Sequence, residues 1–359
     1  MPRLLWIGSP FFSNELVSCG WEVARHNFEN PAVYGWDDLV QVAGFVPDVL
    51  VVADKSRAPF VLGMEDYPCL TVFYSVDSHI HSWQPFYAQG FDAALISLRD
   101  HLERFVGTFL SREYVWWSPA FAWSEDAPRA DIAKDVDCLF VGSMTADLPR
   151  RKAFLTALGK EVSGLVVTRG AYRELYTHAH VLLNHCEHGD LNFRVFEAMG
   201  CGGCLVTPRI GHGLTDLFTE GKHMFCYAPD TADGLATDGT TVQPDVSVHE
   251  AAAHIRFLLA HPEVARRTGL EALAAVNAGH RAIHRAQAFS RKMQALLPHT
   301  RAITTRRRGL AAAIRESSLR LLYLHWAEQV GNTVLREAYL EAACGRFRTS
   351  SGIMREPKA

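Results

Sequence analysis

The feature that most constrains the fold is a series of short apolar runs that alternate with polar, helix-like segments. In the first half of the chain these runs are residues 3–8, 48–54, 69–79, 91–97 and 114–121. Because they are apolar at consecutive positions, both faces of each strand must be covered, as in parallel strands that lie under helices. The pattern predicts a doubly wound α/β domain.

A second series of the same kind follows a polar, acidic segment that contains proline, residues 122–137. We interpret this segment as a linker. A chain of 359 residues is also long for a single core. The sequence therefore predicts two Rossmann-like domains that face a cleft, residues 1–121 and 138–290. A helical C-terminal extension, residues 291–359, is expected to follow them.

Composition excludes several classes of protein. Lys and Arg total 36 against 39 Asp and Glu, a formal net charge of −3, so we expect no general attraction to nucleic acid. No apolar run approaches the roughly 20 residues that span a bilayer, and no signal peptide is recognisable. The eight cysteines lack the spacing of a disulfide framework. They predict reduced thiols in a cytoplasmic protein.

A basic run, TRRRG at residues 305–309, precedes an amphipathic segment at 310–330. This segment could make a peripheral contact with a membrane surface or a partner. It could instead pack its apolar face on the body of the protein. The second interpretation is favoured because the segment carries acidic residues as well as Arg.

The richest chemistry lies at residues 184–203, NHCEHGDLNFRVFEAMGCGG. Zinc would accept a set of His and Cys ligands drawn from this region. The candidates are His185, Cys186, His188, Cys201 and Cys204. Two of them are adjacent, however, and adjacent residues of a strand point to opposite faces. The last begins an apolar run that is better used as a buried strand, so a zinc site is not expected.

The CGGC sequence could also be a redox pair. A reactive Cys-x-x-Cys lies at the start of a helix, where the helix dipole lowers the pKa of the first thiol. Here the pair follows a helix-like segment and precedes a strand-like run. The order of elements therefore argues against a redox role.

An anion site fits the order of elements better. A strand ends before Gly189, and a helix is expected to open at Asp190 to Asn192, residue types suited to N-capping. The free N–H groups and the dipole at that end favour phosphate. Arg194 adds a guanidinium that can grip a diphosphate, and Glu197 could accept hydrogen bonds from ribose hydroxyls. The alternative is that Arg194 and Glu197 form only a surface ion pair.

The same region resembles a known family. The sequences LNFRVFEAMGCGGCLVT and GLTDLFTEGKHMFCY, within residues 191–227, resemble the signature of CgeB-like (spore-maturation type) glycosyltransferases. They resemble the wider GT-B glycosyltransferases more loosely. A weaker similarity extends from about residue 69 to residue 287.

The resemblance implies a GT-B fold, with a nucleotide-sugar donor bound mainly by the C-terminal domain and an acceptor bound across the cleft. Carried onto matching positions, Arg151, Asn192 and Arg194 would face the diphosphate and Glu197 the ribose. The family's turn under the donor corresponds to Gly142 and Ser143. GT-B enzymes usually need no essential metal or other cofactor, because positive side chains and a helix N-terminus stabilise the leaving diphosphate.

A general base is needed if the reaction inverts the sugar. Asp77 and His79 follow an apolar strand at alternate positions, with His81 next in the series, and are candidates for this role. They could equally be a capping residue and solvated loop positions. Nine residues separate Glu187 from Glu197, whereas many retaining GT-B enzymes have seven between two Glu. Retention or inversion is left open.

The sequence therefore predicts a cytoplasmic glycosyltransferase that moves a sugar from a nucleotide-sugar to an unidentified acceptor. The alternative from another class is a non-catalytic nucleotide- or nucleotide-sugar-binding protein on the same fold. A dinucleotide cofactor is not expected, because the first predicted strand ends in IGSPFF, which lacks the GxGxxG fingerprint.

Overall fold

A computed structural model describes residues 1–27, 34–56, 61–129, 132–229 and 244–345. Contacts divide the chain into two compact units. The first unit comprises residues 1–96, 101–117 and 286–359, and the second comprises residues 97–100 and 118–285. Residues 122–137, predicted as a linker, thus fall in the second unit. Residues 291–345, predicted as a separate extension, fall in the first, and residues 346–359 lie outside the described part.

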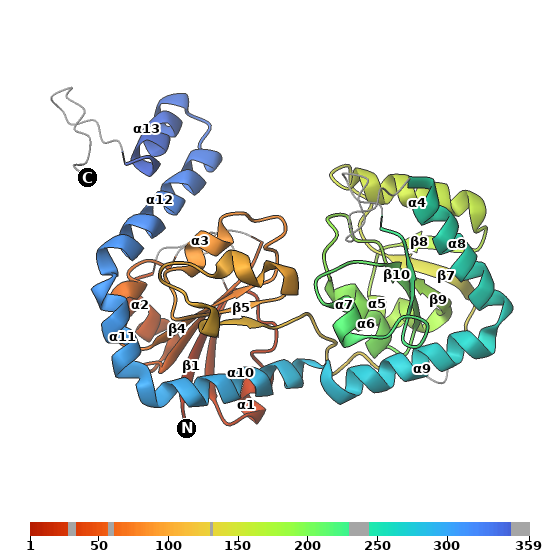
Figure 1. The fold of residues 1–359 in the computed structure, drawn as a ribbon, viewed down its shortest axis with the longest axis horizontal. Coiled ribbons are helices and arrows are strands. Elements are labelled where there is room, and N and C mark those ends of the chain that lie inside the picture. Colours follow the sequence, from red (N-terminus) through yellow and green to blue (C-terminus); the bar gives the residue numbers. More distant parts are fainter. Residues whose placement is uncertain (28–33, 57–60, 130–131, 230–243, 346–359) are drawn as a thin grey trace. The chain divides into compact units, whose positions relative to one another are not determined.

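The first unit is built on a six-stranded, all-parallel sheet in the order β2-β1-β3-β4-β5-β6 (Figure 1). Its strands are β1 (Arg3–Ile7), β2 (Glu22–His26), β3 (Val49–Ala53), β4 (Leu70–Ser75), β5 (Ala93–Ile96) and β6 (Val115–Trp117). Short helices connect them, namely α1 (Glu15–Ser18), α2 (Trp36–Ala43) and α3 (Gln84–Ala88). Strands β1, β3, β4, β5 and β6 fall in the five apolar runs, whereas β2 was not predicted. It is an edge strand that pairs only with β1, so its residues stay half-exposed and show no apolar run.

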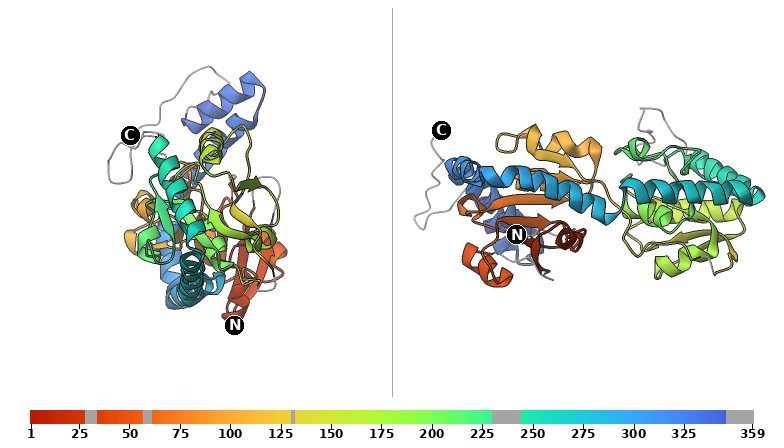
Figure 2. Two further views of the ribbon diagram at one scale, coloured as in Figure 1. Left: turned by 90° about the vertical axis from the view of Figure 1, so that its right-hand side faces the viewer. Right: turned by 90° about the horizontal axis from the view of Figure 1, so that it is seen from below.

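The second unit holds a five-stranded parallel sheet in the order β11-β10-β9-β7-β8. Its strands are β7 (Val136–Val141), β8 (Leu165–Thr168), β9 (Ala179–Leu183), β10 (Cys204–Pro208) and β11 (Phe225–Tyr227). Its helices are α4 (Pro149–Glu161), α5 (Tyr172–Leu175), α6 (Phe193–Gly200), α7 (Leu214–Leu217), α8 (Pro244–Ala260) and α9 (Pro262–Gly279). Helices surround each sheet (Figure 2), so the predicted pair of Rossmann-like sheets is confirmed.

The strand order reverses once in each sheet. The chain runs outward from β7 to β8, and then returns to the other side of β7 to add β9, β10 and β11. In the first unit the same reversal lies between β1 and β3. Open α/β sheets bind ligands at the carboxyl ends of the strands that flank such a reversal. The topology therefore points to two places, the end of β7 beside β9 and the end of β1 beside β3.

The C-terminal segment is helical, as predicted, in α10 (Ala282–Leu296), α11 (Thr300–Gly309), α12 (Ala311–Gln329) and α13 (Thr333–Ala343). Helix α12 buries Ile314 and Leu322 in the core of the first unit. The buried Arg307 of α11 pairs with Asp92 and donates to the carbonyl of Cys69. The amphipathic segment thus packs on the body of the protein.

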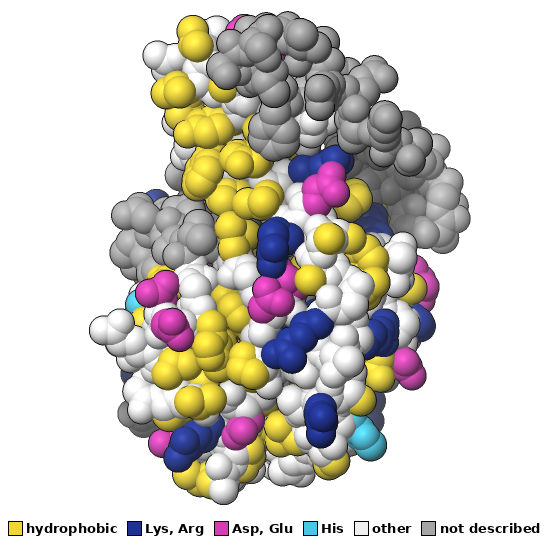
Figure 3. Space-filling view, turned by 90° about the vertical axis from the view of Figure 1, so that its left-hand side faces the viewer, with side chains coloured by type: hydrophobic (Ala, Val, Ile, Leu, Met, Phe, Trp, Pro, Cys, Tyr) yellow, Lys and Arg dark blue, Asp and Glu magenta, His cyan; other side chains and the backbone are white. Residues whose placement is uncertain are grey.

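Helices α12 and α13 still expose some apolar side chains. Leu324, Val334 and Leu335 are 43%, 74% and 48% exposed. Figure 3, a view onto the side at the left of Figure 1, shows a band of hydrophobic side chains in its upper part. None of the described helices combines the length and apolarity needed to cross a bilayer. Peripheral membrane contact stays a prediction.

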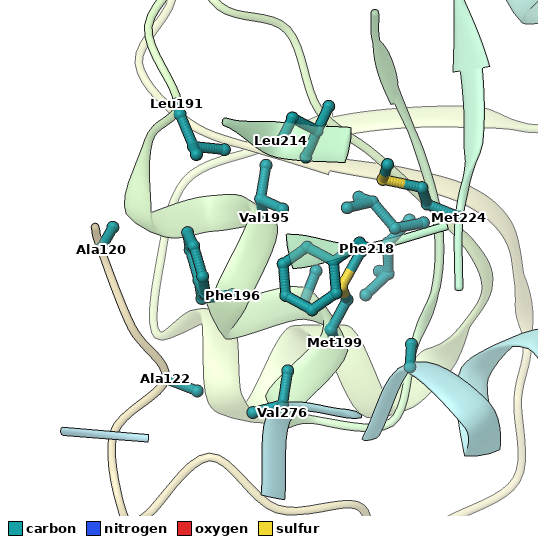
Figure 4. Packing of buried hydrophobic residues seen from close by; sticks show 14 of the residues in the cluster. Ala120, Ala122, Leu191, Val195, Phe196, Met199, Leu214, Phe218, Met224 and Val276 are labelled. Atoms are coloured by element: carbon teal, nitrogen blue, oxygen red, sulfur yellow. The ribbon is translucent and has the colours of Figure 1, made fainter. Parts of the chain in front are cut away.

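The core of the second unit fixes the orientation of α6. Val195, Phe196 and Met199 point into a cluster with Phe218 and Met224 (Figure 4), and all five are buried. Phe193, the first residue of α6, is only partly buried, so Val195 and not Phe193 completes this buried face. With this face held in the core, Arg194 and Glu197 lie on the opposite side of a short helix.

Candidate active site

Helix α6 starts where the sequence predicts, but the side chain of its N-cap residue does not cap the helix. Asn192 is the N-cap residue by its extended backbone, and its side chain makes no capping hydrogen bond. The side-chain amide instead donates to Asn184 Oδ1 at 3.4 Å and to Cys186 Sγ at 3.3 Å. Asn192 therefore helps to hold the loop that follows β9, and its side chain does not complete the helix start.

Arg194 lies at the reversal of the second sheet. Its Nε donates to the carbonyl of Val141, the last residue of β7, at 3.1 Å. Its Nη1 donates to Asn184 Oδ1, just beyond β9, at 2.9 Å. The guanidinium is thus fixed between the carboxyl ends of the two strands where ligands of open α/β sheets bind. The alternative of a simple surface ion pair with Glu197 does not describe these contacts.

Gly142 makes room for this guanidinium. A Cβ at this position would lie 2.9 Å from the Phe140 ring and 3.0 Å from Arg194 Nη2. Both distances are shorter than side-chain contacts allow without a shift. Glycine is therefore required for Arg194 to approach the end of β7 so closely.

A second guanidinium lies on the same aromatic ring. Arg151 Cζ is 5.7 Å from the centre of the Phe140 ring, and Arg194 Cζ is 5.0 Å from it. Arg151 Nη1 donates to the carbonyl of Ser143 at 3.2 Å, and its buried Nε has no hydrogen-bond partner within the described part of the chain. Desolvation, and then the charge of Arg194, lower the pKa of Arg151. An anion bound between these two cations would relieve their repulsion.

The carboxylate of Glu187 is already used by the protein. It accepts hydrogen bonds from the backbone N–H groups of Arg150 at 3.1 Å and Arg151 at 2.7 Å. These groups belong to the first turn of α4, so Glu187 occupies the N-terminus of that helix. Only 4% of Glu187 is exposed. The spacing of Glu187 from Glu197 argued against a direct role for Glu187 in the reaction. In the structure its carboxylate is bound by the first turn of α4.

Arg194 and the residues at the end of β7 line an open pocket of about 330 Å³. Four of the predicted donor-site residues line it, namely Gly142, Ser143, Arg194 and Glu197. Arg151 joins them through its contact with Ser143, while Asn192 is not part of the lining. The sequence reasoning missed further lining residues that follow β8, which are Arg169, Gly170, Tyr172 and Tyr176. The Arg-Gly pair directly after a strand was the available signal.

Glu197 lies deep in this pocket. Burial, and then the charge of Asp126, raise its pKa to about 7. Asp126 is fully buried and accepts hydrogen bonds from Tyr172 Oη at 2.8 Å and Arg173 Nε at 2.7 Å. The segment predicted as a linker thus supplies a carboxylate that holds α5 beside Glu197. Nothing in the composition of that segment marked this role.

The CGGC sequence is structural. Cys201 ends α6 and Cys204 begins β10, the order that argued against a redox pair. Burial raises the pKa of both thiols to about 12, so they are protonated at neutral pH. Gly202 has a left-handed backbone, and a Cβ on Gly203 would lie 2.2 Å from Leu182 of β9. Within the described residues, no group of His, Cys, Asp and Glu is arranged to hold a metal ion.

The first unit carries a separate acidic cluster, Asp54 and Asp77, at the carboxyl ends of β3 and β4, one strand away from the reversal between β1 and β3. Asp77 follows β4, and its carbonyl accepts from the N–H groups of Ile80 and His81, which closes a turn. Burial, and then the charge of Asp54, raise the pKa of Asp77. His79 and His81 act in the opposite direction on the same pKa. The predicted base is therefore partly buried among groups that control its charge.

Comparisons with known proteins relate the chain to glycosyltransferases. Residues 130–291 match the model of a family described as glycosyl transferase-like. No curated protein sequence matches the chain. Among solved structures, Anabaena HepE in complex with UDP and glucose matches at 12% identity and a TM-score of 0.58. The match covers 82% of this chain and 100% of that one.

Two further solved structures show the same fold. Sucrose-phosphate synthase from Thermosynechococcus elongatus matches with a TM-score of 0.54 and 11% identity, over 83% of this chain and 100% of that one. A glycosyltransferase from Rickettsia africae matches with a TM-score of 0.57 and 10% identity, over 83% and 98%. The chain thus has the fold of these enzymes, the GT-B fold that the resemblance implied, and residues 130–291 are similar to a glycosyl transferase-like family.

Proposed function

We propose that this GT-B glycosyltransferase takes its sugar from a nucleoside-diphosphate sugar bound at the end of β7. The observation that carries the proposal is the position of Arg194, fixed between the ends of β7 and β9. A guanidinium can donate two parallel hydrogen bonds to phosphate oxygens. Arg151, on the same Phe140 ring, supplies a second positive charge for the diphosphate.

The other predicted residues receive matching roles. Glu197 accepts hydrogen bonds from the ribose hydroxyls, and the backbone of Gly142 and Ser143 lies under the donor. Asn192 acts indirectly, because it contacts the same Asn184 oxygen that fixes Arg194. Since HepE was captured with UDP and with UDP-glucose, a uridine diphosphate sugar is the first donor to test.

The transfer follows from these roles. In an inverting transfer, Asp77 takes the proton of an acceptor hydroxyl as the oxygen forms its bond to the anomeric carbon. The bond from that carbon to the diphosphate breaks, and the nucleoside diphosphate leaves with the bonding electrons. Arg151 and Arg194 stabilise its growing negative charge, a role that a metal ion fills in other transferases. His79 is the second candidate for the base.

Within the GT-B enzymes, we assign the chain to the CgeB-like type. The assignment is supported by the run from Leu191 to Tyr227, in which the Asn-x-Arg-x-Phe-Glu helix start is followed by a Cys-Gly turn. The acceptor of this type is not defined by the residues described above. Protein, glycan and small-molecule acceptors are therefore all included in the tests.

Donor binding is the first test. Thermal unfolding is followed with UDP, ADP, GDP and the matching sugar nucleotides. A ligand at a hundredfold excess over its Kd stabilises the folded protein by about 2.7 kcal/mol. We expect one diphosphate class to raise the Tm. If none does, the proposed donor site is wrong.

Variants then locate the site. Arg194→Ala should weaken donor binding on the order of 100-fold, because a charge-assisted contact to each phosphate is lost. Arg209→Ala is the matched control, since Arg209 is another guanidinium of the second unit, paired with Glu220. It should bind donor normally. Release of nucleoside diphosphate from the bound sugar nucleotide separates an enzyme from a non-catalytic binding protein, which binds the donor and leaves it intact.

A further inference from the structure

Asp54 is the centre of a hydrogen-bond network in the first unit. It directly follows β3 and is 2% exposed. Its Oδ2 accepts from the backbone N–H groups of Val76 at 3.1 Å and Asp77 at 2.7 Å, and from Gln84 Nε2 at 2.6 Å. Its Oδ1 accepts from the N–H of Ser56 at 2.7 Å. All four contacts come from donors, so both oxygens of Asp54 act as hydrogen-bond acceptors.

These contacts join the ends of two neighbouring strands. Asp54 extends β3, and the two N–H groups on its Oδ2 belong to the residues directly after β4. The side chain of Gln84 ties the start of α3 to the same oxygen. A buried carboxylate with four hydrogen bonds holds such a loop in one arrangement, since each donor would otherwise be unsatisfied.

Ser56 links the two carboxylates. Its backbone is in the left-handed region, with φ of 54°, which is uncommon outside glycine. In this conformation its N–H reaches Asp54 while its hydroxyl donates to Asp77 Oδ2. One oxygen of Asp77 is therefore held by Ser56, and its backbone N–H is held by Asp54.

We propose that Asp54 is a positioning residue for Asp77, fixing the loop after β4 and placing a second carboxylate beside the base. The inference rests on the proposed function, because it assumes that Asp77 takes the acceptor's proton. Asp54 itself does not contact the reacting atoms in this scheme. Its oxygens are already occupied by the protein.

The charge of Asp54 acts on the proton affinity of Asp77. Among the described residues, Asp54 opposes the ionisation of this carboxyl, whereas the Ser56 hydroxyl, His79 and His81 favour it. Together with burial, Asp54 outweighs the other three, and the pKa of Asp77 is raised. A carboxylate with a raised pKa is a stronger general base at neutral pH.

Two substitutions should move Asp77 in opposite directions. Asp54→Asn removes the neighbouring negative charge and should lower the titration midpoint of Asp77 by about one pH unit. Ser56→Ala removes a hydrogen bond to the ionised form and should raise the midpoint. The midpoint is read by carbon-13 NMR of labelled Asp carboxyls, with Asp77→Asn used to identify the resonance. Asp37→Asn, an exposed carboxylate at the start of α2, is the control and should change nothing.

The outcomes separate this inference from the proposed function. If Asp54→Asn leaves the midpoint in place, Asp54 is not the positioning residue. If Asp54→Asn fails to fold, the test rests on Ser56→Ala. An unchanged midpoint of Asp77 in Ser56→Ala would then contradict the proposed hydrogen-bond network. Release of nucleoside diphosphate from the sugar nucleotide is then followed against pH. Its acid limb should shift with the NMR midpoint in each variant. Shifted midpoints without turnover in the wild-type protein would support the network and contradict the proposed function.

Discussion

The ends of the two sheets have the same topology and opposite charge. At the reversal beside β7, the guanidiniums of Arg151 and Arg194 lie on one Phe140 ring. At the neighbouring ends of β3 and β4, the carboxylates of Asp54 and Asp77 are linked through Ser56. Each cluster is built on carboxyl ends of parallel strands, where ligands of such sheets bind.

This difference shows which part of the chemistry comes from the fold. The parallel sheet supplies a location where side chains from separate strands converge, and it does so in both units. The side chains that follow each strand decide whether the location suits an anion or a proton transfer. Four tests address this division of roles, beginning with the largest expected effect.

The acidic cluster should control turnover without controlling donor binding. Asp77→Asn removes the proposed base and should reduce transfer on the order of 10²- to 10⁴-fold, the usual contribution of general base catalysis. Donor affinity, measured by calorimetry, should stay at the wild-type value. His79→Gln is the companion variant and should have the smaller effect. A larger loss of transfer in His79→Gln than in Asp77→Asn would make His79 the first candidate for the base.

Arg151 and Arg194 should bind the donor less tightly when a side chain fills the space beside Gly142. Gly142→Ala places a methyl group against Phe140 and Arg194, and overpacking of this kind costs about 1–3 kcal/mol. Donor affinity should therefore fall by about tenfold or more. Gly159→Ala in α4 is the control, because a Cβ there meets no neighbour. Unchanged affinity in Gly142→Ala would show that Arg194 does not need this close approach.

The pH dependence of stability tests the environment of Glu197. Its folded-state pKa of about 7 lies above the ordinary value of 4.5. Its contribution to stability is thus complete below pH 4.5 and is lost as the pH rises through 7. Glu197→Gln stays neutral throughout, so relative to wild type it should gain about 2 kcal/mol between pH 4.5 and 8. Urea unfolding at both pH values measures this difference.

Equal changes in the two proteins over that pH range would mean that Glu197 titrates normally. The same carboxylate gives a second measurement. Ribose hydroxyls favour the ionised form, so donor binding at pH 7 should release protons in the wild-type protein. Calorimetry in buffers of different ionisation enthalpy detects this release, and Glu197→Gln should abolish it.

The smallest effect is expected at the CGGC sequence. Cys201→Ala and Cys204→Ala remove buried thiols that contact neither cluster in the proposed reaction. Turnover should therefore be unchanged by either variant and insensitive to thiol-blocking reagents. A loss of turnover on removal of one thiol, with the fold intact, would return these residues to the active site.

Several parts of the site were accessible from the sequence because they depend on local order. A strand, a loop, an Asn-x-Arg-x-Phe-Glu helix start and a glycine-rich turn follow one another within twenty residues. That order predicts α6 and selects Arg194 and Glu197, both of which line the pocket. It also dismisses Cys201 and Cys204, which the structure buries as thiols.

Other parts depend on which strands become neighbours. Asp126 lies in a segment that reads as a linker, yet it is buried against α5. Asp54 ends an apolar run and looks like a strand terminus, yet it fixes the loop that carries Asp77. Arg169 and Tyr172 enter the pocket because β8 pairs with β7. No local pattern reports such pairings.

The sequence by itself determined the parallel α/β class, the position of helix α6 and the residue types able to bind a diphosphate. Those features follow from apolar periodicity and from chemistry carried within short segments. Only the tertiary structure decided three contacts. Asn192 donates a hydrogen bond to Asn184, Glu187 accepts hydrogen bonds from the start of α4, and Asp54 accepts one from the backbone N–H of Asp77. Each of these depends on partly buried hydrogen bonds between residues 8 to 37 positions apart in the chain, and only the folded packing brings their atoms within reach.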